Sequence, residues 1–346
     1  MTDFLIQKTP DRGRLYHRAP GIWFSQELNR WLVTSPELIR QAMYDDAFAV
    51  PAYDLSPVTQ KLGVDLGFLS ELRAWFPLAA EGEAHRVLRE KFARHIAQQT
   101  PLALAELSAE LERRRTYLDA VPAGETFCFY AEVLRPVLMR AVCGLANAAL
   151  PTDLPLDTIP QFFDDAISPR RRQRINSLGQ EIFDHLPQDW SSDQKYLSCG
   201  IIALSANTLL GSVSLTFLEA LGASPSKVMS QVAWGTELMR TGLALIEKRT
   251  VRDTVLGGVP LPSGSRVRLF IESEGVLPGG SYAYSDLFFA VGSHRCVGMS
   301  VSRQAWAKIA AFLATIDRPL SVLEVAERTG DYVFNYPDLI RVRFDG

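Results

Sequence analysis

A single cysteine, Cys296, stands directly before a predicted helix near the end of the chain. From Met299 onward, apolar residues recur at the spacing of one helix face, at Val301, Ala305, Trp306, Ile309 and Leu313. Unpaired N–H groups and the helix dipole stabilise negative charge at a helix N-terminus. The sequence therefore favours a thiolate at Cys296, and the fold has to bring this helix N-terminus to whatever the thiolate binds.

Two glycines flank this cysteine. Gly292 precedes it by four residues and Gly298 follows it by two, so the backbone here can pass close to a flat, bulky group. A lone thiolate in such a loop suits a haem iron, whose proximal ligand in one enzyme class is a cysteine. The alternative interpretation is a buried cysteine in a glycine-containing loop, which is the usual environment of a free cysteine.

The stretch from Phe289 to Gly298 resembles the haem-binding signature of the cytochrome P450 superfamily, Phe-x-x-Gly-x-(His or Arg)-x-Cys-x-Gly. Every defining position is filled, by Phe289, Gly292, His294, Cys296 and Gly298. The resemblance implies a mainly α P450 fold with a small β region. It also implies haem b as the cofactor, bound by these five residues, with Cys296 as the axial ligand of the iron.

His85 and Arg89 are four residues apart in a predicted helix, so they share one face. Two donors on one face can hold an anion, and an arginine can bind a carboxylate through two hydrogen bonds. A solvated basic face is the alternative. In the P450 family, a His-x-x-x-Arg pair at this relative position binds a haem propionate, so the resemblance implies that role for His85 and Arg89, with His294 nearby.

Turn signals at residues 257–258 and 262–264 separate short predicted strands. This region resembles the P450 strand segment Arg-x-x-x-x-Asp-x-x-x-Gly-Gly. Counting back from Asp253 places Lys248 at the family's propionate-binding arginine, with Arg249 one residue away. The resemblance leaves both Lys248 and Arg249 open as propionate ligands. We name Arg249 as the candidate, because the family uses an arginine.

Glu237 and Arg240 are three residues apart in a stretch that we predict to be helical. A Glu-x-x-Arg pair at this place in the P450 family belongs to a buried charge network that supports the cysteine loop. The chain lacks the family's Phe-x-Pro-x-Arg segment, whose arginine completes that network. We therefore expect the cysteine loop to be braced differently here.

Between Lys195 and Lys227 the only charged residue is Glu219, and the length would span a bilayer. Serines, threonines and an asparagine make the segment too polar for a lipid-facing helix, so we predict a buried central helix over residues 196–221. The resemblance implies that this helix passes the oxygen-binding face of the haem.

Oxygen-activating members of the family usually carry an acid followed by threonine in this helix. The preferred register places Asn207 at the acid and Thr208 at the alcohol, as catalytic residues. A register three residues earlier places Leu204 and Ser205 there instead. An amide cannot ionise, so Asn207 would relay protons less well than an acid.

The N-terminal part is predicted to form a β-hairpin over residues 21–34. Ser35 as N-cap and Pro36 at the first helical position then start a helix that ends near Tyr44. The basic run at residues 170–174 is interpreted as solvated, with a docking site for an electron donor as the alternative. No repeat or linker divides the chain, so we predict one haem-thiolate domain over residues 1–346.

The net charge of −3 gives no electrostatic reason to expect nucleic acid or a membrane surface as a partner. The four cysteines are widely scattered and form no metal-binding cluster in the sequence, which favours a reduced compartment. The first residues lack the pattern of a secretory signal. We therefore expect a cytoplasmic protein.

The leading functional hypothesis is a haem-thiolate monooxygenase that oxidises a small organic molecule of the secondary-metabolite type. It would receive electrons from a ferredoxin-type partner. The second hypothesis is a haem-thiolate enzyme that uses peroxide or rearranges or dehydrates its substrate, and the third is a non-catalytic haem-binding or partner-recruiting protein. Substrate contacts are expected from residues 45–80, 160–190, 200–212 and 332–336.

Overall fold

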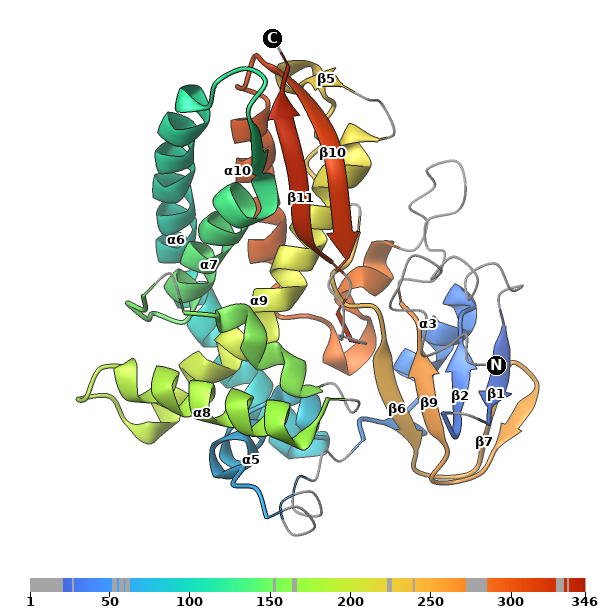
Figure 1. The fold of residues 1–346 in the computed structure, drawn as a ribbon. Coiled ribbons are helices and arrows are strands. Elements are labelled where there is room, and N and C mark those ends of the chain that lie inside the picture. The colour runs from blue at the N-terminus through green and yellow to red at the C-terminus, as the bar shows by residue number, and fades with distance from the viewer. Residues whose placement is uncertain are drawn as a thin grey trace.

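The structure, a computed structural model, describes residues 21–26, 28–51, 55, 59, 63–151, 154–163, 167–222, 226–238, 240–271, 285–327, 333–334 and 336–345. Most of the helices gather on one side of the molecule, and the largest sheet lies on the other side (Figure 1). The main helices are α3 (Pro36–Tyr44), α5 (Gly67–Arg73), α6 (Gly82–Ala120), α7 (Arg135–Leu145), α8 (Pro169–His185), α9 (Ser192–Leu221) and α10 (Met299–Leu313).

The strands of the described residues form three small sheets, with the orders β1-β2-β9-β6-β3, β4-β11-β10-β5 and β7-β8. This agrees with the predicted mainly α fold with a small β region. The strands are β1 (Ile22–Ser25), β2 (Arg30–Val33), β3 (Phe48–Ala49), β4 (Thr126–Cys128), β5 (Lys227–Val228), β6 (Ile246–Thr250), β7 (Thr254–Leu256), β8 (Val259–Leu261), β9 (Arg266–Leu269), β10 (Pro319–Glu327) and β11 (Pro337–Phe344).

The predicted hairpin and the helix after it are both present. β1 pairs with β2 in antiparallel register. The Ser35 side chain accepts a hydrogen bond from the Leu38 backbone N–H, and Pro36 occupies the first helical position of α3. Ile39 and Ala42 of α3 are fully buried in one cluster with residues of the five-stranded sheet. α3 therefore covers one face of that sheet.

The predicted central helix is α9, which is mostly buried between other elements. A capping box between Ser191 and Gln194 fixes its N-terminus. By length and composition α9 could cross a membrane, but 67% of its most hydrophobic window is buried inside the protein. The burial accounts for its apolar composition, since a core helix is apolar on all sides.

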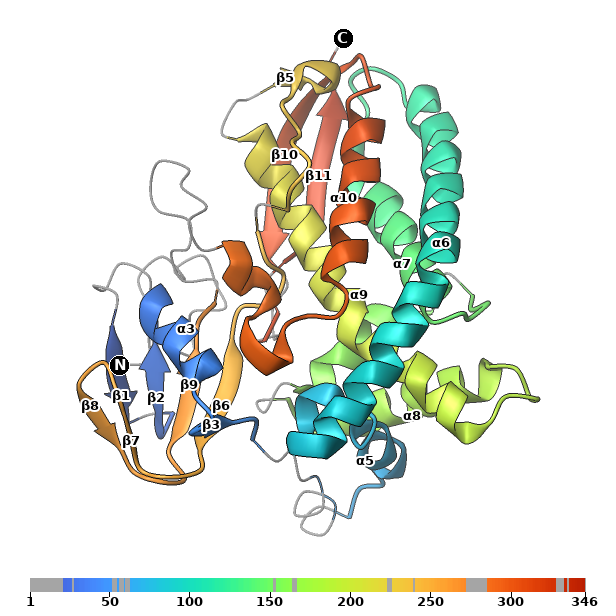
Figure 2. The ribbon, with the colours of Figure 1, turned by 180° about the vertical axis from the view of Figure 1, so that it is seen from behind.

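α6 is the longest helix and runs beside α7 and α10, as the view from behind shows (Figure 2). His85 is a buried residue in the first turn of α6. α10 carries the predicted apolar face, and Val301, Ala305, Trp306, Ile309 and Leu313 are all buried in the main core.

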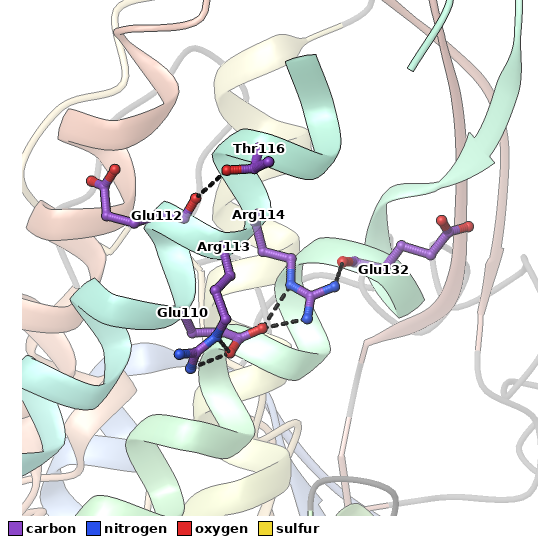
Figure 3. A network of polar contacts seen from close by, with 6 residues as sticks. All are labelled: Glu110, Glu112, Arg113, Arg114, Thr116 and Glu132. Atoms are coloured by element: carbon purple, nitrogen blue, oxygen red, sulfur yellow. Dashed lines mark hydrogen bonds and ion pairs between the residues drawn. The ribbon is translucent and has the colours of Figure 1, made fainter. Parts of the chain in front are cut away.

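A buried carboxylate ties α6 to the segment that leads into α7 (Figure 3). Glu110 is 3% exposed and accepts hydrogen bonds from the Nε atoms of Arg113 and Arg114, each at 2.7 Å. Arg114 Nη1 also donates to the Glu132 backbone oxygen at 3.1 Å, in the π-helical turn η2 (Tyr130–Leu134). The network therefore connects α6 to η2.

The prediction of a helix around Glu237 and Arg240 is wrong. Among the described residues between α9 and β6, the only helical segment is the 3₁₀ turn η4 (Met229–Gln231). The described part of the stretch from Gly235 to Leu243 is irregular and lies against α9. A Cβ on Gly242 would be 2.6 Å from the Thr208 carbonyl oxygen and 2.8 Å from the Gly211 Cα.

Candidate functional site

The cysteine loop, residues 289–298, folds back on itself directly before α10. The Cys296 N–H donates to the Phe289 carbonyl oxygen at 2.7 Å, and the Arg295 N–H donates to the Gly292 carbonyl oxygen at 3.2 Å. Gly292 has a φ of +73°, and a Cβ there would lie 2.8 Å from the Met43 carbonyl oxygen. Only glycine fits this conformation and this close approach to α3.

The Cys296 thiol lies at the N-terminus of α10, as predicted. The thiol has accessible surface because it borders a cavity, yet it lies deep among protein atoms, and this burial raises its pKa. Hydrogen bonds from the Gly298 and Met299 N–H groups and the charge of Arg89 lower the pKa and oppose the burial. These groups would stabilise a thiolate bound to a cation.

A cavity of about 420 Å³ lies between the cysteine loop, α6, α9 and the edge of the five-stranded sheet. The cysteine loop contributes residues that were predicted to bind haem. Those that line the cavity are Phe289, His294, Cys296 and Gly298, and His85 and Arg89 line it from α6.

A cluster of basic groups borders one part of this cavity. The rings of His85 and His294 are 4.2 Å apart between centroids. Lys248 is 5% exposed, and its Nζ donates to the Phe48 carbonyl oxygen at 3.2 Å. The nearest acid is Glu81, whose Oε2 lies 3.4 Å from His294 Nε2.

Burial and neighbouring cations both disfavour the protonated forms of the groups in this cluster. Burial, followed by the charges of Lys248 and His85, lowers the pKa of His294 to about 4. Burial also lowers the pKa of His85, with a further contribution from Arg89, and lowers the pKa of Lys248. His85 Nε2 and His294 Nδ1 are buried without a hydrogen-bond partner among the described residues. An anion bound here would stabilise the protonated forms of these groups and would give the two ring nitrogens a hydrogen-bond partner.

No protein-family model and no curated protein matches the sequence. Solved structures do match. P450BioI, in complex with an acyl carrier protein ligated to hexadec-9Z-enoic acid, has a TM-score of 0.71 at 16% identity, over 99% of each chain. Epothilone B-bound cytochrome P450epoK has a TM-score of 0.71 at 17% identity, over 99% of this chain and 98% of that chain. CalO2 has a TM-score of 0.73 at 15% identity, over 99% of this chain and 97% of that chain.

The chain has the cytochrome P450 fold. The predicted fold class is therefore confirmed. Within this P450 fold, the cysteine loop, α6 and α9 surround one cavity, which is the arrangement that the sequence motifs implied.

In this P450-fold chain, Arg249 does not reach the cavity. Side chains alternate along β6, so Lys248 and Thr250 are buried whereas Arg249 is exposed. A Cβ built on Gly264 would lie 3.6 Å from Arg249 Nη2, which places this guanidinium beside a turn. Of the two cations that were predicted as alternatives, Lys248 lines the cavity and Arg249 does not.

The cavity and the burial of its neighbours show which side of α9 faces the cavity. Thr208 lines the cavity, and so do Leu204 and Ser205 of the alternative register. Asn207 does not line it and is fully buried, with neither side-chain polar atom bonded among the described residues. Thr208 Oγ1 donates to the carbonyl oxygen of Leu204 or Ser205, at 2.9 and 3.1 Å.

The Glu237 and Arg240 side chains do not pair with each other. Glu237 Oε2 lies 3.1 Å from Arg303 Nε on α10, and Arg240 Nη1 lies 3.6 Å from Glu219 Oε2 on α9. The Arg303 guanidinium also lies over the Phe289 ring, 5.6 Å from its centroid. The segment before β6 is thus linked to the cysteine loop through α10.

Three of the four regions that were expected to contact substrate contribute described residues to the cavity wall, including residues 200–212 of α9. Val50, Pro77 and Leu78 line the cavity from the first region and Phe334 from the last, whereas no described residue of 160–190 lines it. Tyr332 and Asn335 lie outside the described residues.

Sequence reasoning missed Arg30, Glu247 and Arg268, which line the cavity from β2, β6 and β9. Polar residues in short strands carry no motif, so no signal in the sequence brings these three together.

Proposed function

We propose that this chain is a haem-thiolate oxidoreductase that oxidises a small organic molecule. The observation that carries the proposal is the position of Cys296. Its thiol borders the cavity and accepts hydrogen bonds from the N–H groups of Gly298 and Met299 at the start of α10. A sulfur held in this way can ligate a metal from one side only, which leaves the opposite side of the cavity open to substrate.

The residues around the cavity fit a haem group. Haem carries two carboxylates. Arg89 and Lys248 would supply positive charge to them, and the rings of His85 and His294 would supply hydrogen bonds. The unpartnered His85 Nε2 and His294 Nδ1 are donors or acceptors ready for such a ligand.

Haem bound at Cys296 would supply iron-centred oxidation chemistry, favoured by electron donation from the thiolate. The protein's own residues position the substrate and handle protons. Thr208 Oγ1 is hydrogen-bonded to its own helix as a donor, so its lone pairs are free to accept a hydrogen bond from a water molecule in the cavity. Apolar side chains such as Leu204, Leu245 and Phe334 exclude bulk water.

The solved structures support a substrate of mainly apolar character. They show fatty-acyl carrier protein with P450BioI and epothilone B with P450epoK. We infer a monooxygenase acting on a small organic molecule of the secondary-metabolite type, in the cytoplasm, with electrons from a ferredoxin-type donor.

The decisive experiment is the absorption spectrum of the reduced, carbon-monoxide-bound protein purified after haem-replete expression. We expect the long-wavelength band of a thiolate-ligated haem, and loss of that band in Cys296→Ser. The matched control is Cys128→Ser, which changes a half-buried cysteine that does not line the cavity. Protein that holds no haem, or a band that survives in Cys296→Ser, contradicts the proposal.

A second candidate is a haem-thiolate enzyme that uses peroxide or needs no electrons. One observation favours it: the described side chains that α9 presents to the cavity include no carboxylic acid, and Asn207 faces elsewhere. Proton delivery to bound oxygen would then rest on Thr208 and water alone. Product formation with peroxide but without reductant would support this candidate, whereas strict dependence on NADPH and ferredoxin would support the monooxygenase.

A further inference from the structure

Three charged side chains from three neighbouring strands meet at the wall of the cavity. Glu247 on β6 is directly opposite Arg268 on β9 in the antiparallel register. Arg30 comes from β2, which pairs with β9 on its other side. Each of the three lines the same cavity as Cys296. We call Arg30, Glu247 and Arg268 the strand triad.

The strand triad and Lys248 belong to different faces of the sheet. Glu247 and Lys248 are neighbours on β6, so their side chains point to opposite faces. β3 pairs with β6 only at Arg249 and Thr250, and no described strand pairs with residues 246–248 on that edge. Because both Glu247 and Lys248 line the cavity, it extends around the unpaired edge of β6 and borders both faces of the sheet.

Both arginines of the strand triad use one and the same carboxylate oxygen. Arg30 Nη1 donates to Glu247 Oε1 at 2.6 Å, and Arg268 Nε donates to this atom at 2.5 Å. Glu247 Oε2 is buried without a partner among the described residues. Two cations thus face one anion, which leaves one positive charge in excess within the triad.

This excess charge is held away from water. The side chains of Arg30, Arg268 and Glu247 are 8%, 10% and 9% exposed. Burial lowers the pKa of Arg30, and the charges of Arg268 and Arg266 lower it further against the opposing effect of Glu247. A buried charge without a counter-charge is costly, and a second carboxylate at the cavity side of the guanidinium groups would remove that cost.

The surroundings of the triad are apolar. Leu28 and Leu245 line the cavity beside it, and Leu245 is buried in a cluster with Leu32 and Phe270. A ligand that satisfies both features carries one negative charge on an apolar body. A carboxylate matches two planar guanidinium groups best, because each can offer it parallel N–H donors.

We propose that Arg30 and Arg268 form a subsite for the carboxylate of a monocarboxylic acid with an apolar body, and that this acid is the class of substrate. The inference rests on the proposed function, since it takes the cavity to be the substrate cavity. The carboxylate would lie at the strand triad, and the apolar body would extend along the part of the cavity that haem leaves open to substrate.

The first experiment uses the unmodified protein and isothermal titration calorimetry, which needs no haem signal. Decanoate and decanamide have the same shape and differ in charge. We expect decanoate to bind at least about tenfold more tightly, as two charge-assisted hydrogen bonds would give. Affinities within about threefold of each other overturn the proposal, because the cavity would then recognise the apolar body alone.

The second experiment changes the charges in opposite directions. Arg268→Gln should weaken decanoate binding at least about tenfold, whereas Glu247→Gln should strengthen it, because removal of the competing carboxylate frees both guanidinium groups. Arg249→Gln is the matched control, since Arg249 lies on β6 but is exposed and away from the cavity. Equal weakening by Arg268→Gln and Glu247→Gln would show a purely structural triad and contradict the subsite.

Failure of the subsite can be told apart from failure of the proposed function. Haem content and the carbon-monoxide spectrum are measured on the same samples. Normal haem with no preference for decanoate overturns the subsite alone. Selective decanoate binding in protein without haem supports the subsite and overturns the haem-thiolate assignment. Loss of haem in Arg268→Gln would assign the triad to the haem carboxylates and overturn the substrate role.

Discussion

At the scale of single residues, the conformation of the cysteine loop depends more on Gly292 than on its other glycine, Gly298. Gly292 adopts a left-handed φ and also approaches α3, where the Met43 carbonyl oxygen blocks any Cβ. Gly298 lacks both constraints, since a Cβ there would make ordinary contact with the Cys296 sulfur. Close backbone contact at Gly292 therefore helps to hold the loop against α3.

Gly292→Ala should destabilise the protein by about 2–4 kcal/mol, because the left-handed backbone costs about 1–2 kcal/mol and the contact with the Met43 carbonyl adds to it. The control is Gly258→Ala, which has a φ of +80° but nothing within 4 Å of the new Cβ. Urea unfolding of both variants isolates the clash. Equal losses would show that α3 yields without cost.

Glu110→Gln should cost about 1–3 kcal/mol, since it removes charge-assisted hydrogen bonds. The loss stays below that of a fully buried ion pair because Arg113 and Arg114 keep 53% and 27% of their side chains exposed. Burial alone would raise the pKa of Glu110, but hydrogen bonds from both arginines outweigh it and hold the pKa below its ordinary value.

The pH dependence of this variant follows from that direction. A carboxyl with a lowered pKa in the folded state stabilises the protein above the unfolded pKa of about 4.3, and this contribution is lost as pH falls through the folded pKa. The difference in unfolding free energy between wild type and Glu110→Gln should therefore be full at pH 7 and shrink below about pH 4. A difference that stays constant with pH would contradict the ionic origin.

At the scale of elements, the segment between α9 and β6 has a different construction from the one its sequence motif implied. Glu237 and Arg240 reach α10 and α9 instead of each other, through side chains that are 65% and 30% exposed. Backbone N–H groups of this segment hydrogen-bond directly to α9. The Gly242 N–H donates to Ser212 Oγ at 2.9 Å, and the Arg240 N–H donates to Thr216 Oγ1 at 3.3 Å.

Glu237→Gln and Arg240→Gln should each change the free energy of unfolding by less than about 1 kcal/mol, as expected for exposed ion pairs. A buried Glu-x-x-Arg network would instead lose about 3–5 kcal/mol. Urea titration with Ser212→Ala as comparison separates the two, because this variant removes the acceptor of a backbone hydrogen bond. A loss above about 2 kcal/mol in either charge variant would contradict the structure's account.

At the scale of the whole molecule, the cavity and its basic cluster make stability depend on the ligand. Bound haem would pair its carboxylates with the basic groups beside His85 and His294 and occupy the part of the cavity next to Cys296. Free haem at a thousandfold excess over its Kd would stabilise the fold by about 4 kcal/mol. We therefore expect the melting temperature of haem-loaded protein to exceed that of haem-free protein by several degrees in calorimetry. Equal melting temperatures would contradict binding to the native state.

What the sequence could predict depended on how local each feature is. The cysteine loop, the hairpin and the capped start at Ser35 each lie within one short stretch, and all three have the expected form. The choice between Lys248 and Arg249 could not be made from the sequence, because neighbouring residues of a strand point to opposite faces and only the structure shows that Lys248 lines the cavity. The strand triad escaped notice because strand pairing joins β2, β6 and β9 from distant parts of the chain.

The close approach of Gly242 to α9 has a consequence for attempts to reshape the pocket by mutagenesis. Two of its walls, α9 and the residues leading into β6, touch backbone to backbone at Thr208 and Gly211, so neither can retreat without displacing the other. Room for a bulkier compound can be gained only where side chains form the boundary. Libraries aimed at Leu28, Val50, Leu78 and Phe334 should therefore yield altered selectivity far more often than libraries aimed at residues 240–243.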